Sequence, residues 1–271
     1  MKINLKDKKA LIGGSSKGLG YAVAKQLAVC GAMVTLVSRN ESLLKSNILE
    51  LKELTGIKHD YLVVDYDNNL EYKKIINKFF SKNSVDILIN NSQGPPAGDV
   101  LSVSEEDYEN SFNLLFQNTV NTSMAAIREM KKNNWGRIIN IASVHGHVAS
   151  LNKSAYVSSK HGMIGLTKAI AIETAKFPIT CNAICPGWVD TPLVSEQIKF
   201  NARIKKISQK GGDLYLSSSI TKSIKNTFES LVKKVKRGDD SILIGDGADP
   251  NLDYKLAPCC NPLPGDSVFG F

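Results

Sequence analysis

The stretch ALIGGSSKGLGYAVAKQLAVCG, residues 10–31, decides the fold. A short apolar run leads into closely spaced glycines, Gly14, Gly18 and Gly20, and helix-forming residues follow. Such glycines allow a tight turn and let backbone N–H groups at a helix start approach a pyrophosphate. A glycine-rich strand–helix turn without a ligand is the alternative. The place of this loop after the first strand of a repeated array favours nucleotide binding.

Short β-branched runs alternate with longer helical patterns over the first 190 residues. The predicted strands are 10–14, 33–38, 60–65, 86–91, 137–143 and 179–186, and helices are predicted to begin near Gly18, Ser42, Leu70, Ser104 and Ser154. This alternation predicts an α/β protein, a doubly wound parallel sheet (Rossmann fold) in a three-layer α/β/α arrangement. Right-handed crossovers then bring the carboxyl ends of all strands, and any ligand, to one edge.

The composition is that of an ordinary globular protein, with 42% hydrophobic and 22% charged residues in a chain of 271. No apolar run approaches the roughly 20 residues that span a bilayer, so no membrane association is expected. The basic start MKINLKDKK lacks the apolar core of a signal peptide. Five cysteines without framework spacing fit a reducing compartment, and a cytoplasmic location is expected.

The net charge of +8 is concentrated in one segment. Residues 201–237 hold ten lysines and arginines against Asp213 and Glu229, so this segment carries about the whole excess. Aromatic residues do not alternate with these lysines, as a stacking platform for nucleic acid requires. A solvated helix face is therefore favoured, and nucleic acid is not expected as a partner.

Polar residues at the predicted strand ends indicate which cofactor the loop takes. The second strand ends in Ser38-Arg39 with no acidic residue for a ribose 2′-hydroxyl, and Arg39 with Lys17 suits the 2′-phosphate of NADP. NAD remains the alternative, because Arg39 also fits a solvated strand end. Asp65 ends the third strand near the expected adenine edge, and Asn90 ends the fourth. Both also fit turn formers.

The stretch SVHGHVASLNKSAYVSSK, residues 143–160, places Ser143, Tyr156 and Lys160 on the predicted ligand edge. A free tyrosine has a pKa of about 10, and a nearby ammonium lowers it toward neutrality. Tyr156 then protonates a carbonyl oxygen as hydride arrives, or deprotonates an alcohol in reverse. Ser143 holds the same oxygen, and Lys160 tunes the tyrosine and binds ribose. The other Tyr-x-x-x-Lys copy, Tyr21–Lys25, lies in the loop helix and is interpreted as structural.

Together, the glycine loop, the Asn-Asn strand end, the serine, Tyr-x-x-x-Lys and the Pro-Gly strand end resemble the short-chain dehydrogenase/reductase family. The resemblance covers residues 1 to about 198 and implies that Ser143, Tyr156 and Lys160 are catalytic. The cofactor-binding residues that it and the loop pattern indicate are Gly14, Ser16, Lys17, Gly18, Leu19, Gly20, Arg39, Asp65, Asn90, Tyr156, Lys160, Pro186, Gly187 and Thr191.

Within the family, residues 138–198 resemble 3-hydroxybutyrate dehydrogenases. That resemblance implies that His145, Lys153, Trp188 and Gln197 hold the substrate, the polar ones gripping its carboxylate. The chemistry is consistent, because a lysine and a histidine charge-assist bonds to a small anion. Each residue also has a plain alternative: a loop lysine, a turn residue, a core tryptophan and a helix-surface glutamine.

Two departures from the family pattern concern the first 142 residues. Where the family places an asparagine that holds a proton-relay water, this chain has Leu115, and Asn113 and Asn118 should point elsewhere on the helix. Leucine neither donates nor accepts, so a slow relay is expected. Residues 1–142 also resemble 3-oxoacyl-carrier-protein reductase-like proteins rather than hydroxybutyrate dehydrogenases.

After about residue 200 the resemblance ends, which divides the chain into a Rossmann-type domain (1–200) and an atypical segment (201–271). The segment is expected to form a basic helix over 220–235, and SILIGDG (241–247) is expected to add a seventh strand to the sheet. Its end, around Cys259-Cys260, resembles a fragment of Rel/SpoT-type alarmone synthetase/hydrolases. Two adjacent cysteines do not close a tetrahedral zinc site, so no metal is expected.

The predicted function is an NADP-dependent oxidoreductase, with NAD as the alternative cofactor, that interconverts a small 3-oxo acid and its 3-hydroxy acid. The substrate is then a small anion; a 3-oxoacyl-thioester (acyl-carrier-protein) reductase is the alternative. A nucleotide-binding protein with little catalysis is the hypothesis from another class, because of Leu115 and because the family's substrate lid is not recognisable after about residue 200. A homo-oligomer, a dimer or tetramer, is expected from the family resemblance.

Overall fold

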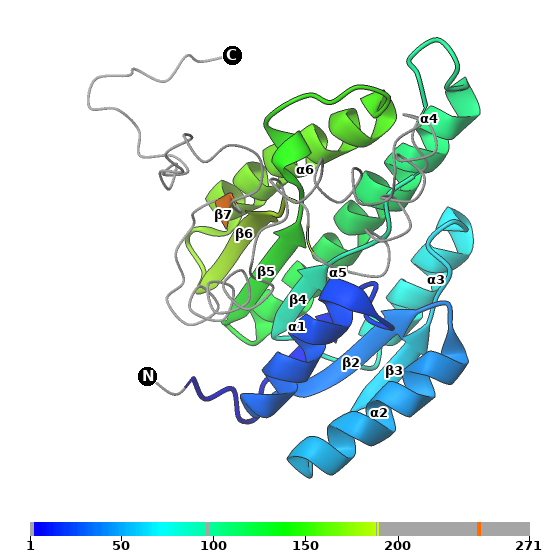
Figure 1. The fold of residues 1–271 in the computed structure, drawn as a ribbon. Coiled ribbons are helices and arrows are strands. Elements are labelled where there is room, and N and C mark those ends of the chain that lie inside the picture. Colours follow the sequence, from blue (N-terminus) through cyan, green and yellow to red (C-terminus); the bar gives the residue numbers. More distant parts are fainter. Residues whose placement is uncertain (1–2, 96–97, 188, 190–242, 245–271) are drawn as a thin grey trace.

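The structure, a computed structural model, describes residues 3–95, 98–187, 189 and 243–244. Within these residues, seven parallel strands form one sheet in the order β3-β2-β1-β4-β5-β6-β7 (Figure 1). The strands are β1 (Lys9–Ile12), β2 (Met33–Ser38), β3 (Asp60–Val63), β4 (Ile87–Asn90), β5 (Gly136–Ile141), β6 (Ile179–Cys185) and β7 (Leu243–Ile244). The doubly wound parallel sheet predicted from the sequence is confirmed.

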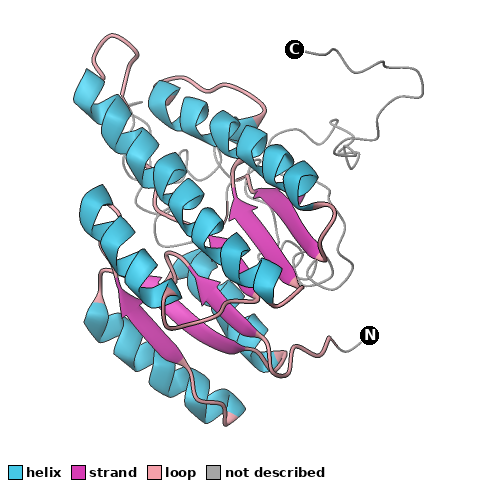
Figure 2. Cartoon of the chain, turned by 180° about the vertical axis from the view of Figure 1, so that it is seen from behind, coloured by secondary structure: helices cyan, strands magenta, loops and turns pink. Residues whose placement is uncertain are grey.

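Helices cover both faces of the sheet, as the pattern of strands that are apolar on both sides requires. The helices are α1 (Gly18–Val29), α2 (Glu41–Thr55), α3 (Asn69–Phe80), α4 (Glu105–Phe112), α5 (Asn118–Lys132) and α6 (Ser154–Thr174). Ile12 of β1 packs with α1 and α2, whereas its neighbour Leu11 packs with α3, α5 and α6. The views from the two sides show these two layers (Figures 1 and 2).

Several predicted strands are shorter than expected at their carboxyl ends. The strands predicted over 10–14, 60–65 and 137–143 end at Ile12, Val63 and Ile141. The residues just beyond them turn away from the ladder into loops, so they lie at the ligand edge rather than within the sheet.

The helix predicted to begin near Ser104 contains a local irregularity that the sequence did not indicate. Its N-terminus is closed by a capping box between Ser104 and Asp107. After Phe112 the chain forms a π-helical turn, η1 (Asn113–Gln117), and continues as α5. Such turns are frequent at functional sites.

Two residues of the segment predicted to add a seventh strand do pair with β6. Leu243 lies opposite Ile184 and Ile244 opposite Cys185 in parallel register. The predicted helix over 220–235 and the Cys259-Cys260 tail lie outside the described residues. No helix in the described part of the chain combines the length and apolarity needed to cross a membrane.

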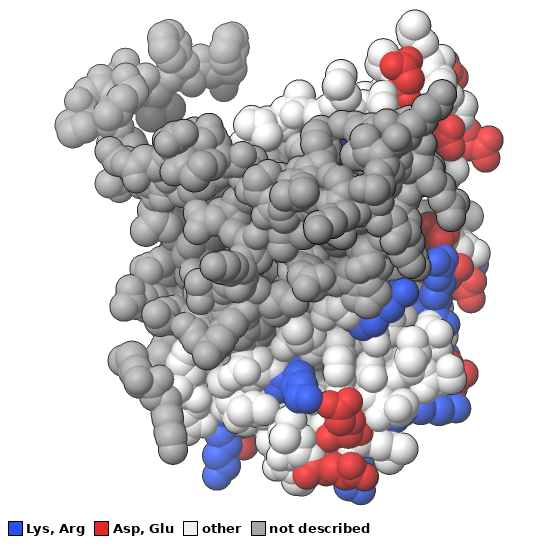
Figure 3. Space-filling model, in the orientation of Figure 1, with Lys and Arg blue, Asp and Glu red and all other residues white. Residues whose placement is uncertain are grey.

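Basic and acidic side chains are interspersed on the described part of the face drawn in Figure 3. Among the described residues, Lys45 pairs with Glu41 of the same helix at 2.8 Å. The basic segment 201–237 lies outside the described residues.

A buried chain of amide hydrogen bonds joins β4 to β5. The Asn90 Nδ2 donates to Asn140 Oδ1 (2.8 Å) and to Ser123 Oγ (2.9 Å), and Asn140 Nδ2 donates to Thr167 Oγ1 (2.9 Å). All four side chains are buried. Polar groups removed from water must be paired, so this network specifies the β4–β5 register directly below the ligand edge.

We expect Asn140→Ala to lower the free energy of unfolding by about 2–3 kcal/mol, because Asn90 and Thr167 lose their buried partner. Urea unfolding followed by circular dichroism measures the loss. Asn77→Ala, at an exposed position of α3, is the control and should change it by less than about 0.5 kcal/mol. Equal effects of the two substitutions would contradict a structural role for the network.

Candidate active site

The glycine loop between β1 and α1 is shaped to receive a phosphate group. Gly14 has a φ of 55°, a conformation that favours glycine. A Cβ on Gly20 would collide with the carbonyl oxygen of Gly14. No side chain caps the N-terminus of α1, and its first turn holds no acidic residue. Its free N–H groups therefore remain available to an anion, which fits the pyrophosphate of a dinucleotide.

Asn91, rather than Asn90, contacts the glycine loop through its side chain. Asn91 Nδ2 lies 3.1 Å from the carbonyl oxygen of Gly13, to which it donates. The Asn90 side chain is committed to the buried network below the edge. A cofactor contact by Asn90 is thus left to its backbone. The Asn-Asn pair signalled the position, but only the structure separates the two roles.

The other residues predicted for the loop lie along its rim. Ser16 is half-buried, and its carbonyl oxygen accepts a hydrogen bond from Asn47 Nδ2 (2.9 Å). Leu19 packs against the core beneath α1. Lys17 is exposed, at the point where α1 begins.

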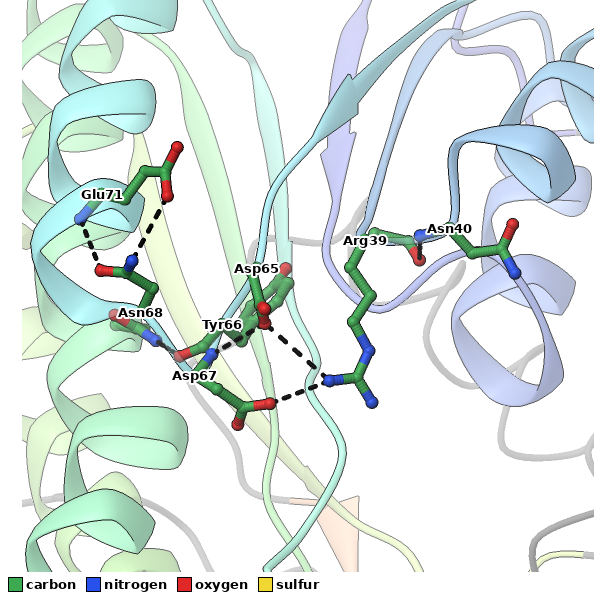
Figure 4. A network of polar contacts seen from close by, with 9 residues as sticks. Arg39, Asn40, Asp65, Tyr66, Asp67, Asn68 and Glu71 are labelled. Carbon is green, nitrogen blue, oxygen red and sulfur yellow. Dashed lines mark hydrogen bonds and ion pairs between the residues drawn. The ribbon is translucent and has the colours of Figure 1, made fainter.

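Arg39 and Asp65 are brought together at the ends of β2 and β3. Arg39 Nη1 lies 2.9 Å from Asp67 Oδ2 and 3.9 Å from Asp65 Oδ1. The Arg39 side chain reaches across the space between the two strand ends toward these carboxylates (Figure 4). The sequence indicated Arg39 and Asp65 separately. It gave no reason to choose Asp67 as the partner.

Ser143 follows β5 at the ligand edge, as predicted. It caps the short helical turn Val144–Gly146, and its Oγ accepts a hydrogen bond from the His145 N–H (3.2 Å). Because that bond uses a lone pair, the hydroxyl hydrogen of Ser143 remains able to donate. The Val144 N–H donates to the carbonyl oxygen of Pro186 (3.1 Å), so the end of β6 lies beside Ser143.

Tyr156 lies in the first turn of α6 and faces Ser143. Burial raises the pKa of Tyr156, a hydrogen bond with Ser143 lowers it, and the Cys185 thiol raises it again. A Cβ on Gly94 would lie 3.0 Å from Cε2 of Tyr156, so the backbone after β4 lies against the ring. The sequence did not indicate the role of Gly94 or of Cys185.

Lys160 is 3% exposed and lies one helical turn beyond Tyr156. Its Nζ donates to the carbonyl oxygen of Ile141 at 2.7 Å and lies 5.6 Å from the centre of the Tyr156 ring. Burial lowers the pKa of Lys160 to about 8, against an opposing effect of Cys185. The ammonium therefore predominates at pH 7. The pKa of Tyr156 is nevertheless raised overall, with burial as the largest cause, so the lowering expected from the sequence is not found.

His145 and Lys153 flank the same tyrosine. The His145 ring is in edge contact with Tyr156 at 6.0 Å between centres, and Lys153 Nζ lies 6.0 Å from the ring centre. Burial, with a smaller effect of Lys153, lowers the pKa of His145 to about 4. His145 is thus neutral near pH 7, which removes the cationic alternative that the sequence left open.

The loop that carries Lys153 is tied to the loop after β4. Gly98 and Lys153 form an isolated parallel bridge, and the Gly98 N–H donates to the carbonyl oxygen of Asn152 (2.9 Å). Tyr108 on α4 donates its hydroxyl to Ser154 Oγ (2.6 Å). These contacts, which no sequence pattern predicted, hold the start of α6 in place.

Leu115 is fully buried in the π-helical turn η1. Its carbonyl oxygen accepts a hydrogen bond from Thr119 Oγ1 (2.8 Å). Asn118 instead donates to the carbonyl oxygen of Tyr66 (2.9 Å), near the strand ends at the adenosine side. Asn118 thus points away from Tyr156, as expected, and a polar side chain is missing at the relay position.

The remaining predicted site residues divide into two groups. Pro186 and Gly187 follow β6 at the ligand edge. Trp188, Thr191 and Gln197 lie outside the described residues. The second Tyr-x-x-x-Lys pair lies on α1, where Lys25 pairs with Glu50 of α2 at 2.7 Å, away from the site.

We expect His145→Gln to flatten the pH dependence of stability between pH 6.5 and about 4. The pKa of His145 falls from 6.5 to about 4 on folding, so the unfolded chain binds the proton first as pH drops. Native stability is therefore lost over this window in the wild type. Melting temperatures measured across it test this, with His161→Gln on the exposed face of α6 as the control. An unchanged slope in His145→Gln would contradict the assignment.

Comparisons with known proteins agree with this geometry. The family model described as short chain dehydrogenase matches residues 8–202. The chain is 37% identical over 201 residues to a D-beta-hydroxybutyrate dehydrogenase of Cupriavidus necator, covering 73% of this chain and 77% of that protein. It is 32% identical over 207 residues to the 3-oxoacyl-(acyl-carrier-protein) reductase FabG of Aquifex aeolicus, covering 73% and 82%.

A solved structure shares this fold. A variant of actinorhodin polyketide ketoreductase with NADPH superposes with a TM-score of 0.80 at 26% identity, covering 89% of this chain and 96% of that one. The family model spans more than half of the chain, and it includes the glycine loop, Ser143, Tyr156 and Lys160. The chain is therefore an enzyme that belongs to the short-chain dehydrogenase/reductase family.

Proposed function

We propose that this protein is an NADP(H)-dependent oxidoreductase that interconverts a small 3-oxo acid and its 3-hydroxy acid. The observation that carries the proposal is the convergence of Ser143, Tyr156 and Lys160 at the ligand edge, beside His145 and Lys153. The identity to hydroxybutyrate dehydrogenases supports the substrate class.

The cofactor would lie along the edge from the glycine loop to Ser143. The N–H groups at the start of α1 would hold the pyrophosphate, and Arg39 with Lys17 the 2′-phosphate. Asp65, the Asn90 backbone and the Pro186-Gly187 turn complete the proposed contacts, with Thr191 added from the family pattern. When bound, a nicotinamide cofactor supplies or accepts the hydride.

The proton would move at the hydroxyl oxygen of Tyr156. With the substrate bound, Ser143 would donate its one hydroxyl hydrogen to the substrate oxygen and so orient that oxygen toward the phenol. Tyr156 gives its proton to that oxygen in reduction and takes it back in oxidation. Lys160 keeps the phenolate accessible through its charge, held in place by the Ile141 carbonyl.

The substrate carboxylate would be held by Lys153 as the cation and by neutral His145 as a hydrogen-bond donor. This division of roles follows from the depressed pKa of His145. Trp188 and Gln197 are proposed to contact the same substrate, on the strength of the resemblance in their segment.

Reduction of a 3-oxoacyl thioester is the second candidate function. Two observations favour it: the identity to a carrier-protein reductase, and an apolar rim beside the site. Leu101 is 94% exposed and Leu151 90% exposed, on the two loops that the Gly98–Lys153 bridge joins. An acyl chain would cover such side chains. Cofactor binding without turnover is the third reading, supported by Leu115.

The proposal extends to the location, the oligomeric state and the domains of the protein. We propose a cytoplasmic homo-oligomer, a dimer or tetramer, whose first 200 residues form the dinucleotide-binding domain and whose later segment completes the sheet through β7. In the described part of the chain, Cys30, Cys181 and Cys185 form no disulfide bond, which is compatible with a reducing compartment.

We expect Tyr156→Phe to lower kcat at least about 10²-fold, because no other group supplies the proton that Tyr156 transfers. NADPH oxidation is followed with acetoacetate, with an acetoacetyl thioester and with neither. Tyr21→Phe, in the other Tyr-x-x-x-Lys pair, is the matched control and keeps activity. An active Tyr156→Phe would refute the mechanism, and binding of NADPH without turnover on either substrate would support the non-catalytic reading.

We expect Lys153→Met to raise KM for acetoacetate about tenfold, since one charge-assisted bond to the carboxylate is lost. The KM for the uncharged ethyl acetoacetate should stay within about twofold in the same assay. Lys168→Met, on the exposed face of α6, removes a charge at a distance and should leave both values in place. A parallel rise for both substrates would assign Lys153 to positioning α6 instead.

A further inference from the structure

A cluster of opposite charges closes the gap between the ends of β2 and β3. Arg39, the residue that follows β2, pairs with Asp67 at 2.9 Å and lies 3.9 Å from Asp65. Figure 4 shows the arginine extended across the gap, with both carboxylates on the opposite loop. This gap is the place where the adenosine part of the cofactor would lie in the proposed function.

The backbone on both sides of the gap is fixed. Asn40 caps α2 by accepting from the Leu43 N–H (3.0 Å), which holds the chain next to Arg39. On the other side, Asn68 caps α3 by accepting from the Glu71 N–H (3.1 Å). The neighbouring Tyr66 is anchored by Asn118 (2.9 Å). Asp67 therefore stands between two anchored residues.

Asp67 is the stronger of the two partners of Arg39. Its Oδ2 is one hydrogen-bond length from the guanidinium, whereas Asp65 Oδ1 is farther away and also accepts from the Asp67 N–H (3.1 Å). The side chains of Arg39 and Asp67 are each 62% exposed. An ion pair so exposed contributes only up to about 1 kcal/mol, so another anion can replace it.

Within this corner, Arg39 faces two carboxylates, those of Asp65 and Asp67, before any cofactor arrives. A 2′-phosphate that binds Arg39 must displace Asp67 and remain near it, whereas a ribose with a free 2′-hydroxyl carries no charge to be repelled. The same corner thus tolerates both forms of the cofactor.

We propose that Asp67 is a specificity-determining residue that competes with the 2′-phosphate of NADP(H) for Arg39 and so limits the preference for NADP(H) over NAD(H). This inference rests on the proposed dinucleotide binding at this edge. It assigns to Asp67 a role in ligand choice that neither the glycine loop nor Arg39 alone provides.

The test is the dissociation constant of NADPH and of NADH, measured by cofactor fluorescence on the full chain at low ionic strength, where exposed charges are least screened. We expect Asp67→Asn to tighten NADPH about fivefold and to leave NADH within about twofold. Asp60→Asn, at the opposite end of β3, removes the same charge and serves as the matched control with an unchanged ratio. An unchanged NADPH-to-NADH ratio in Asp67→Asn overturns the proposal.

A double-mutant cycle separates competition for Arg39 from simple repulsion of the phosphate. If Asp67 acts by occupying Arg39, the gain from Asp67→Asn largely disappears in an Arg39→Gln background. A gain that persists there overturns competition as the cause. Failure of the wild type to bind either cofactor would refute the proposed function itself, a result distinct from cofactor binding whose selectivity ignores Asp67.

Discussion

The hydrogen bond from the buried ammonium of Lys160 to the carbonyl oxygen of Ile141 is the contact on which the site depends. A lysine that is 3% exposed must have a partner, because an unpaired buried charge costs several kcal/mol. The available partner is the last residue of β5, so the bond fixes α6 against the end of that strand. Tyr156, one turn earlier on α6, is thereby placed opposite Ser143, two residues beyond Ile141.

The same burial sets the chemistry of the pair. Removal of Lys160 from water lowers its pKa to about 8, while the burial of Tyr156 raises the pKa of the phenol. The two shifts move apart two proton affinities that are nearly equal in free solution, so the Lys160 ammonium gives up its proton more readily than the Tyr156 phenol does. The hydrogen bond with Ser143 opposes the rise at Tyr156, because a hydrogen bond donated to the phenolate stabilises the charged form of Tyr156.

The sequence predicted the parts of this protein that follow from local pattern. The strand–helix alternation, the glycine loop and the Ser143–Tyr156–Lys160 set could all be predicted, because hydrophobic periodicity and glycine placement depend on the chain's own backbone. Contacts between distant segments could not be predicted. The pairing of Arg39 with Asp67, the packing of Gly94 on Tyr156 and the bridge between Gly98 and Lys153 arise only when the loops meet at one edge.

The asparagines show the same limit more sharply. Adjacent in the chain, Asn90 and Asn91 point in opposite directions, since successive side chains along a strand alternate between faces. The Asn90 amide donates within the buried network, and the Asn91 amide donates to the glycine loop. A sequence pattern marks the pair as a unit and cannot assign the two roles.

Leu115 serves the packing of the fold but lacks the polar side chain that the family pattern places at this position. In the π-helical turn its carbonyl oxygen accepts from the Thr119 hydroxyl, so the backbone there is satisfied without a polar side chain at position 115. The apolar side chain is fully buried and stabilises the packing of the turn. A leucine at the relay position therefore costs the structure nothing. In the proposed mechanism, the effect of this leucine would fall on the return of a proton to the Tyr156–Lys160 pair, a step that the hydride transfer itself does not include.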